Sequence, residues 1–283
     1  LSTRILKKLI VLEKLMATID IPVALSSKFI TQVTEENGRH YLVDGEKHKS
    51  VTSLIDGTIR AYGLEKWKAG WIDTQLSKFI GKELTKSLAD EIVTAADKEA
   101  AESARIGTEV HSIIERLLKD EEVDFSTLDN QLIPAVQAWL RWRQEHIDWK
   151  LVGTEVGVYG SYGGVRYAGQ VDALFQKSHN SYMVVDWKTS SGLFESSFMQ
   201  AAAYAYALKS MKKSRFMYCG AQVVRLVNDY PRDENNKKLR DEPKVFNGKV
   251  QFADLDIEHW IDTFGHLCSL STGKSRYQSR KTI

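Results

Sequence analysis

The chain has 283 residues, of which 43% are hydrophobic and 27% charged, proportions typical of a globular protein with a substantial core. Its net charge is only +2, so any contact with nucleic acid must come from local patches and not from a global basic field. No apolar run reaches the roughly 20 residues of a membrane-spanning helix, so we expect no membrane partner. Two cysteines, Cys219 and Cys268, are too few for a four-cysteine zinc or iron–sulfur site, and they favour a reducing, intracellular compartment.

The N-terminal third begins with residues 1–15, a basic amphipathic stretch compatible with a first helix, a targeting segment or an added sequence. Residues 30–43 then alternate weakly and end at Asp44-Gly45, a dipeptide that favours a tight turn, so we expect a short hairpin here. Ser50-Val51-Thr52-Ser53 is typical of a helix N-terminus and predicts a helix from Leu54 toward Gly63.

The middle of the chain has a helical pattern. Residues 64–90 carry several lysines and two tryptophans, and we interpret the tryptophans as packing residues. Residues 89–119 have apolar positions at helical spacing, and we expect Gly107 to interrupt this helix. Residues 130–147 predict another amphipathic helix with a core stripe of Val136, Trp139, Leu140 and Trp142.

From residue 150 the period of the pattern changes to two, which predicts strands. We expect strands at 150–159, 163–176 and 181–188, a helix at 194–212, strands at 216–227 and 244–252, and a helix at 254–270. We predict that residues 1–90 form a hairpin and helical extension packed on the core. Residues 91–283 would then form the core, with a C-terminal helix and a basic tail.

The chemistry concentrates in residues 165–188, where two apolar runs flank a polar turn and predict adjacent antiparallel strands. Asp172 lies within the first run and Asp186 near the end of the second. Because strand side chains alternate, Lys188 points the same way as Asp186, while Trp187 points to the opposite face. Ionised groups among apolar neighbours are costly unless compensated, either by a divalent cation between the carboxylates or by an internal Asp–Lys ion pair.

Asp172 followed by Asp186-x-Lys188 resembles the PD-(D/E)XK nuclease superfamily. Three further motifs resemble its RecB-like exonuclease branch, which includes phage and mitochondrial genome maintenance exonucleases. These motifs are Gly107-Thr108-x-x-His111, Gly169-x-x-Asp172 and Gln200-x-x-x-Tyr204. The resemblance covers about residues 100–227, and Ser50-Val51-Thr52 is similar to the start of stand-alone members.

The resemblance implies an α/β fold with a restriction-endonuclease-like core, a mixed central sheet flanked by helices, and a long N-terminal helical elaboration. It implies a metal-dependent DNA exonuclease acting on single strands or ends in recombination, replication or DNA maintenance, with a replication or recombination protein as a possible partner. The alternatives are an inactive DNA-binding protein on the same fold, an endonuclease, or an adaptor protein whose acids are paired internally. The expected compartment is bacterial or phage-infected cytoplasm, or the mitochondrial matrix.

By the same resemblance, one or two magnesium or manganese ions are held by His111, Asp172, Asp186 and the backbone carbonyl of Trp187. No iron–sulfur cluster is expected. Lys188 would orient the attacking water or stabilise charge on the phosphate, and Glu155 would hold a second metal or a water.

The resemblance also assigns DNA contacts to the helix at 194–212. Gln200 and Tyr204 lie one turn apart and share a helix face. Lys212 and Lys213 follow on the same helix and are candidate phosphate contacts, although lysines at a helix end are also favoured by the helix dipole alone. Glu115, beside the histidine motif, is interpreted as a surface partner of Arg116 or Lys119.

Overall fold

The computed structural model describes residues 30–35, 38–211, 218–227 and 249–279. The segment at 1–15 and the candidate DNA contacts Lys212 and Lys213 lie outside these residues. Eight strands within the described ranges form one sheet. They are β1 (Ile30–Glu35), β2 (Gly38–Val43), β3 (Glu46–Ser50), β4 (Lys150–Tyr162), β5 (Val165–Ser178), β6 (Ser181–Lys188), β7 (Tyr218–Val227) and β8 (Lys249–Asp254).

The sheet is mixed. Its order is β1-β2-β3-β5-β6-β7-β8, with β4 pairing β5 off this path. The β3–β5 and β6–β7 pairs are parallel, and the other pairs among the described strands are antiparallel. With helices on both faces, this architecture confirms the predicted α/β fold with a restriction-endonuclease-like core.

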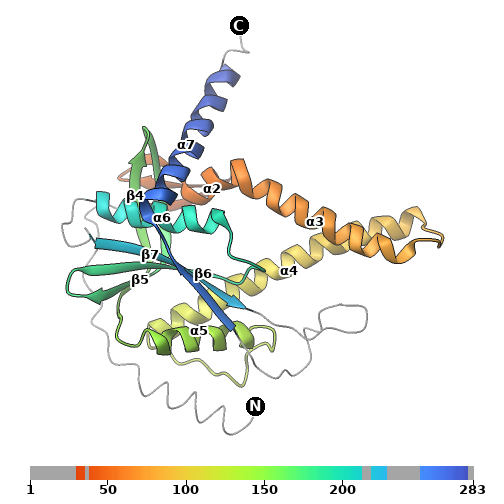
Figure 1. Cartoon of the computed structure of the whole chain (residues 1–283), viewed down its shortest axis with the longest axis horizontal. Coiled ribbons are helices and arrows are strands. Elements are labelled where there is room, and N and C mark those ends of the chain that lie inside the picture. Colours follow the sequence, from red (N-terminus) through yellow and green to blue (C-terminus); the bar gives the residue numbers. More distant parts are fainter. Residues whose placement is uncertain (1–29, 36–37, 212–217, 228–248, 280–283) are drawn as a thin grey trace.

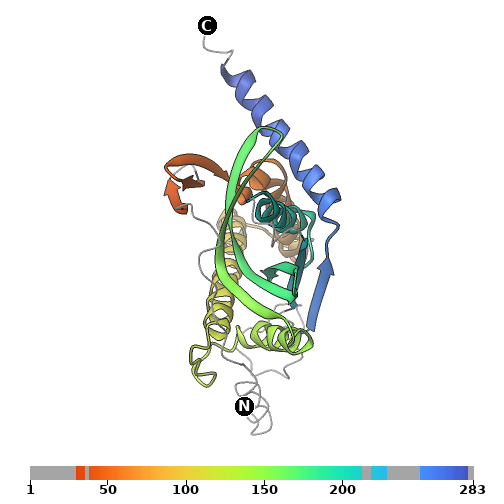
Figure 2. The same ribbon diagram turned by 90° about the vertical axis from the view of Figure 1, so that its left-hand side faces the viewer.

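The longest hairpin, β4–β5, forms because alternating apolar residues flank Gly163 and Gly164, whose φ angles of +56° and +79° suit a tight turn. The hairpin curves along its length (Figure 2). On its other edge β5 pairs with β3 at Ala168 and with β6 from Ala173 onward. The positions of β5 between these two pairings therefore have no strand partner on this edge, and the functional residues gather there.

The helices lie in two layers. They are α2 (Val51–Ile55), a π-helical turn (Asp56–Arg60), α3 (Ala61–Leu76), a 3₁₀ turn (Ser77–Phe79), α4 (Lys86–Leu118), α5 (Ile133–Glu145), α6 (Glu195–Ser210) and α7 (Ile257–Ser279). Buried side chains of α2, α6 and α7 share one core with the sheet, and those of α5 and the C-terminal half of α4 share the other. Helix α6 is deeply buried because five of its residues are alanines, which let it approach the sheet closely.

Helix α3 and the N-terminal half of α4 extend away from the sheet as a long helical hairpin, which we call the arm (Figure 1). Lys68 Nζ of α3 lies 2.5 Å from Asp97 Oδ1 of α4 and links its two helices. The arm exposes several large apolar side chains, including Trp67 and Ile80, so part of the expected tryptophan packing is missing. Its position agrees with the expected N-terminal helical elaboration. The division of the chain near residue 90 stays a prediction, and that position lies in the first turns of α4.

Several helices differ from the sequence-based expectations in where they begin, end or break. Gly107 does not interrupt α4, which runs unbroken because one glycine costs a helix only about 1 kcal/mol. The first helix starts at Val51, earlier than expected, and its helical path continues past Gly63, while residues 80–85 break the expected helix at 64–90. The last helix continues to Ser279 and includes much of the expected basic tail. None of the helices in the described residues is long and apolar enough to cross a bilayer.

Candidate active site

The register between β5 and β6 places the two predicted catalytic acids side by side. Ala173 faces Val185, so one position further along the strands Asp172 lies beside Asp186. The strands separate at this point, and the Trp187 N–H donates to Asp172 Oδ2 at 2.8 Å instead of to a backbone carbonyl. The Asp172 carboxylate thus takes the place of a backbone carbonyl as the acceptor, and this hydrogen bond holds Asp172 in a defined orientation.

Asp186 is only 1% exposed, and a carboxylate buried to this extent needs a charged or polar partner. Burial raises the pKa of this carboxyl to about 6, and the nearby Asp172 adds to the rise, whereas Lys188 and His111 oppose it. Asp186 Oδ2 lies 2.6 Å from Lys188 Nζ, an ionic contact, but it accepts no well-oriented hydrogen bond from any described residue. A buried carboxylate oxygen left in this way is a suitable ligand for a cation.

The Asp186–Lys188 contact is also what the alternative of an internal ion pair predicts. The two side chains lie on the same face of β6, as strand alternation requires, with exposed side-chain fractions of 1% and 15%. Contact geometry alone therefore does not separate a structural pair from a catalytic one. The surrounding residues decide the interpretation.

His111 reaches the same place from α4. Its Nε2 lies 3.0 Å from the Trp187 carbonyl oxygen, and its Nδ1 lies 3.6 Å from Asp172 Oδ2. Helix α4, β5 and β6 thus bring together the four groups predicted to bind metal, although no group of three His, Cys, Asp or Glu side chains in the described residues is arranged as a metal cluster. Two carboxylates, one carbonyl and one imidazole fit magnesium or manganese by their donor chemistry.

Gln200 connects α6 to this site. Its Nε2 donates to Asp186 Oδ1 and to the Tyr204 hydroxyl, each at 3.2 Å, and its Oε1 lies 3.4 Å from Lys188 Nζ. The contacts link one amide to both catalytic candidates on β6. They hold Asp186 and Lys188 in fixed positions relative to α6.

Tyr204 packs against the backbone of β5 and is 3% exposed. A Cβ on Gly169 would lie only 2.3 Å from Tyr204 Cε1, so glycine is required for this approach. Burial raises the pKa of the Tyr204 hydroxyl, which therefore stays protonated. The expected contact of Gln200 and Tyr204 with DNA stays a prediction, because the described contacts of both residues are internal.

Glu155 lies beside Asp172 on the neighbouring strand, since Thr154 faces Ala173 and Val156 faces Val171. Its φ of +49° is in the left-handed region, which is strained for a non-glycine residue and is often found at functional sites. The Gln170 side chain donates to the Glu155 carbonyl at 3.2 Å. Three acids therefore lie in a row across β4, β5 and β6, and the role of Glu155 stays a prediction.

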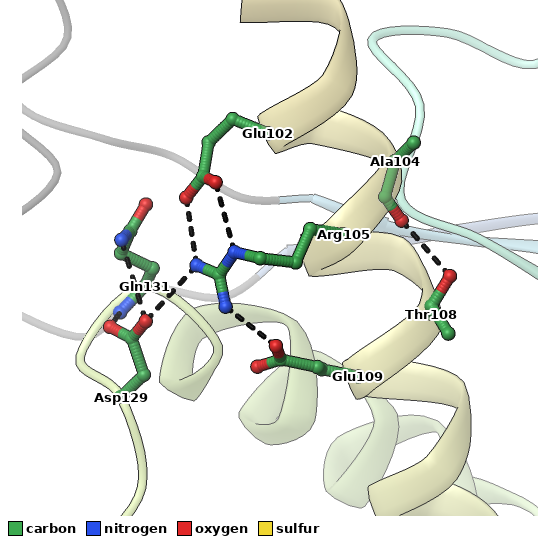
Figure 3. Close-up of polar contacts among 7 residues, drawn as sticks. All are labelled: Glu102, Ala104, Arg105, Thr108, Glu109, Asp129 and Gln131. Atoms are coloured by element: carbon green, nitrogen blue, oxygen red, sulfur yellow. Dashed lines mark hydrogen bonds and ion pairs between the residues drawn. The ribbon is translucent and has the colours of Figure 1, made fainter. Parts of the chain in front are cut away.

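The turn of α4 before His111 is shaped by two small residues. A Cβ on Gly107 would lie 3.1 Å from Thr189 Oγ1, so this glycine lets the segment after β6 lie close to the helix. The Thr108 hydroxyl donates to the Ala104 carbonyl at 3.1 Å (Figure 3). The Thr108 hydroxyl thus contacts its own helix and not the carboxylates of Asp172 and Asp186.

Arg105 organises the opposite side of the same helix and was missed by the sequence analysis. It contacts Glu102 and Glu109 on α4 and Asp129 in the following loop, at 2.6–3.2 Å (Figure 3). These acids raise the pKa of the guanidinium, Glu102 most strongly. The spacing of three and four residues on one helix was a detectable signal for two of the pairs. Glu115 Oε1 lies 2.5 Å from Lys119 Nζ, which confirms its interpretation as a surface partner.

Comparison with known protein families covers the same part of the chain. The family model of the PD-(D/E)XK nuclease superfamily matches residues 83–271, more than half of the chain, and this range includes every site residue described above. No curated protein matches the chain.

Proposed function

The chain belongs to the PD-(D/E)XK nuclease superfamily, and from that premise we propose that it is a divalent-metal-dependent exonuclease that hydrolyses DNA from single-stranded ends. The family supports metal-dependent nuclease activity. Its assignment to the RecB-like branch, and its use in intracellular DNA recombination, replication or maintenance, are parts of the proposal. They depend on the motifs at Gly107–His111, Gly169–Asp172 and Gln200–Tyr204.

One observation carries the proposal: His111, Asp172, Asp186 and the Trp187 carbonyl converge from three separate elements. An internal Asp186–Lys188 pair alone would not need the histidine of α4 beside the carbonyl of β6. Nor would it need the row of acids that ends at Glu155. The arrangement supports a shared ligand for these groups.

A bound divalent metal would supply an acidified water and would offset the charge on the scissile phosphate. We propose that Asp172 and Asp186 hold it through carboxylate oxygens, with His111 and the Trp187 carbonyl completing the protein ligands. Gln200 orients Asp186 through its hydrogen bond to Oδ1, which leaves Oδ2 directed to the site.

Lys188 is proposed to position the attacking water. Its side chain is 15% exposed, and its Nζ contacts both Asp186 Oδ2 and Gln200 Oε1, so its donors point into the site. In the reaction, the water oxygen would attack phosphorus while the water releases a proton to solvent. The phosphorus–oxygen bond to the leaving nucleoside would break, and the leaving oxygen would take up a proton from solvent. The lysine charge would stabilise the additional negative charge on the phosphate oxygens.

Cleavage of matched linear and circular single-stranded DNA tests this function, with magnesium or manganese added and with Lys188→Ala compared with wild type. Lys177→Ala is the matched control, since this exposed lysine lies at the far end of β5, over the Trp149 ring. We expect loss of the linear substrate only, abolished in Lys188→Ala and unchanged in Lys177→Ala. Cleavage of the circle would refute the exonuclease assignment, and DNA binding without cleavage would indicate an inactive binding protein.

A further inference from the structure

Phe194 is an exposed aromatic residue in the connection that leads from Lys188 of β6 to α6. It immediately precedes α6, and 50% of its surface is accessible. Single exposed apolar residues are common on protein surfaces, so exposure alone carries no conclusion. The position of this ring and the support beneath it are the informative features.

The segment that carries Phe194 is held in place at several points. It begins after Lys188, and Thr189 lies close to α4 where Gly107 has no side chain. The Ser190 carbonyl accepts a hydrogen bond from Arg225 Nε of β7 at 2.9 Å, and the Ser190 hydroxyl donates to the Gly192 carbonyl at 2.8 Å. A connection tied to both α4 and β7 presents its aromatic side chain in a defined position.

The Phe194 ring is supported on one side. Three of its atoms lie 3.4–3.9 Å from where a Cβ on Gly192 would be, so the ring packs close to that backbone. The half-exposed remainder faces solvent. A planar ring with backbone behind it and water in front has the form of a platform on which a nucleobase can stack.

The ring is also close enough to the catalytic candidates to contact a bound strand. Phe194 precedes Gln200 by six residues, which corresponds to about 9 Å along a helix axis. Gln200 itself contacts Asp186 and Lys188. Since stacked nucleotides are spaced about 3.4 Å apart, this separation is covered by about three nucleotides.

We propose that Phe194 is a stacking platform for one base of a single-stranded DNA substrate, within about three nucleotides of the scissile phosphate. The inference depends on the nuclease function proposed above and adds a binding subsite to it. The exposed acid Glu195 follows directly, so a phosphate at this position would be repelled, and the base is the part of the nucleotide that fits. Because every base has a π-face, the subsite would tolerate any sequence.

Kinetics on linear single-stranded DNA test the platform with Phe194→Ala, Phe194→Trp and the control Phe252→Ala. Phe252 is a similarly exposed phenylalanine that packs on His146, beyond α5. We expect KM to rise about ten-fold in Phe194→Ala, with kcat nearly unchanged, and to be restored in Phe194→Trp. Phe252→Ala should match wild type. An unchanged KM in Phe194→Ala would overturn the inference.

An abasic scan of the substrate gives a second measurement, whose first part uses wild-type protein alone. Wild type should lose affinity when a single abasic nucleotide occupies one position within about three of the cleaved bond. Phe194→Ala should show no further loss at that position, and an equal loss in both proteins would contradict the stacking contact.

The two proposals fail in different ways. Absence of cleavage by wild type would remove the nuclease function only. Fluorescence anisotropy with labelled single-stranded DNA would then decide the subsite, since weaker binding by Phe194→Ala than by wild type supports it and equal binding overturns it.

Discussion

Replacing the buried acid Asp186 by asparagine should stabilise the protein in the absence of metal while abolishing its function. Asparagine has nearly the shape of aspartate but carries no charge. The cost of burying the ionised carboxylate is therefore removed together with its attraction to Lys188, while the hydrogen bond to Gln200 is kept. The raised pKa of Asp186 indicates that the burial cost is the larger of the two effects.

The magnitude follows from the pKa of Asp186. Its rise from 3.8 to about 6 corresponds to about 3 kcal/mol at 1.36 kcal/mol per tenfold change in proton affinity. Because the folded state binds the proton more tightly, the contribution of Asp186 to the free energy of unfolding is most favourable below pH 4. It falls as the pH rises from about 4 to 6 and stays lower above that range.

Urea denaturation in EDTA between pH 4.5 and 8 measures this effect. We expect Asp186→Asn to exceed wild type by about 2–3 kcal/mol at pH 7.5 and by much less at pH 4.5. Manganese at about 1,000 Kd should reverse the order, because a ligand that binds only the folded state then stabilises wild type by about 4.1 kcal/mol. Asp73→Asn, at an exposed acid of α3 in the arm, should change stability by less than about 0.5 kcal/mol.

Two results would refute the reasoning. If Asp186→Asn in EDTA is no more stable than wild type at pH 7.5, burial of the charge does not dominate at this residue. If the difference between the proteins is the same at pH 4.5 and 7.5, the effect arises from packing and not from ionisation.

Three further substitutions test packing around the site, on the arm and in the core. Gly169→Ala should lower stability by about 1–3 kcal/mol and reduce cleavage, because its Cβ would overlap the Tyr204 ring. Gly70→Ala, on the arm with no atom within 4 Å, should instead raise stability by about 0.5–1 kcal/mol, and a loss like that of Gly169→Ala would contradict the overlap. Gln222→Leu removes the acceptor of the buried Trp142 Nε1–H at 2.8 Å and should cost about 1–3 kcal/mol in urea denaturation, without affecting cleavage. A neutral result there would mean that the indole finds another acceptor.

Much of the fold could be predicted because its signals are local. The period of the pattern changes from helical to strand-like at residue 150, and β4, β5 and β6 all begin within two residues of the predicted positions. Helix boundaries in the arm were less predictable. There, α3 has little apolar periodicity, and its end is set by turn residues such as Gly81 because packing against a core does not constrain it.

The candidate site likewise has one part that local sequence predicts and one part that depends on tertiary packing. Alternation along β6 by itself puts Asp186 and Lys188 on one face, because the strand period is a property of the backbone. The burial of Gln200 and Tyr204 depends on how α6 docks on β5, and two residues of one helix contain no information about the glycine that receives them.

The sequence by itself determined the identities and local spacings of the candidate chemical groups: two acids in apolar strands, a lysine two residues after one of them, and a histidine on a helix. The tertiary structure decided which of these groups meet, since His111 is 76 residues from the Trp187 carbonyl that it contacts. It also decided that Arg105 ties α4 to the loop that follows it and that Phe194 stays exposed between β6 and α6. Contacts between distant segments depend on the packing of whole elements, which no local pattern specifies.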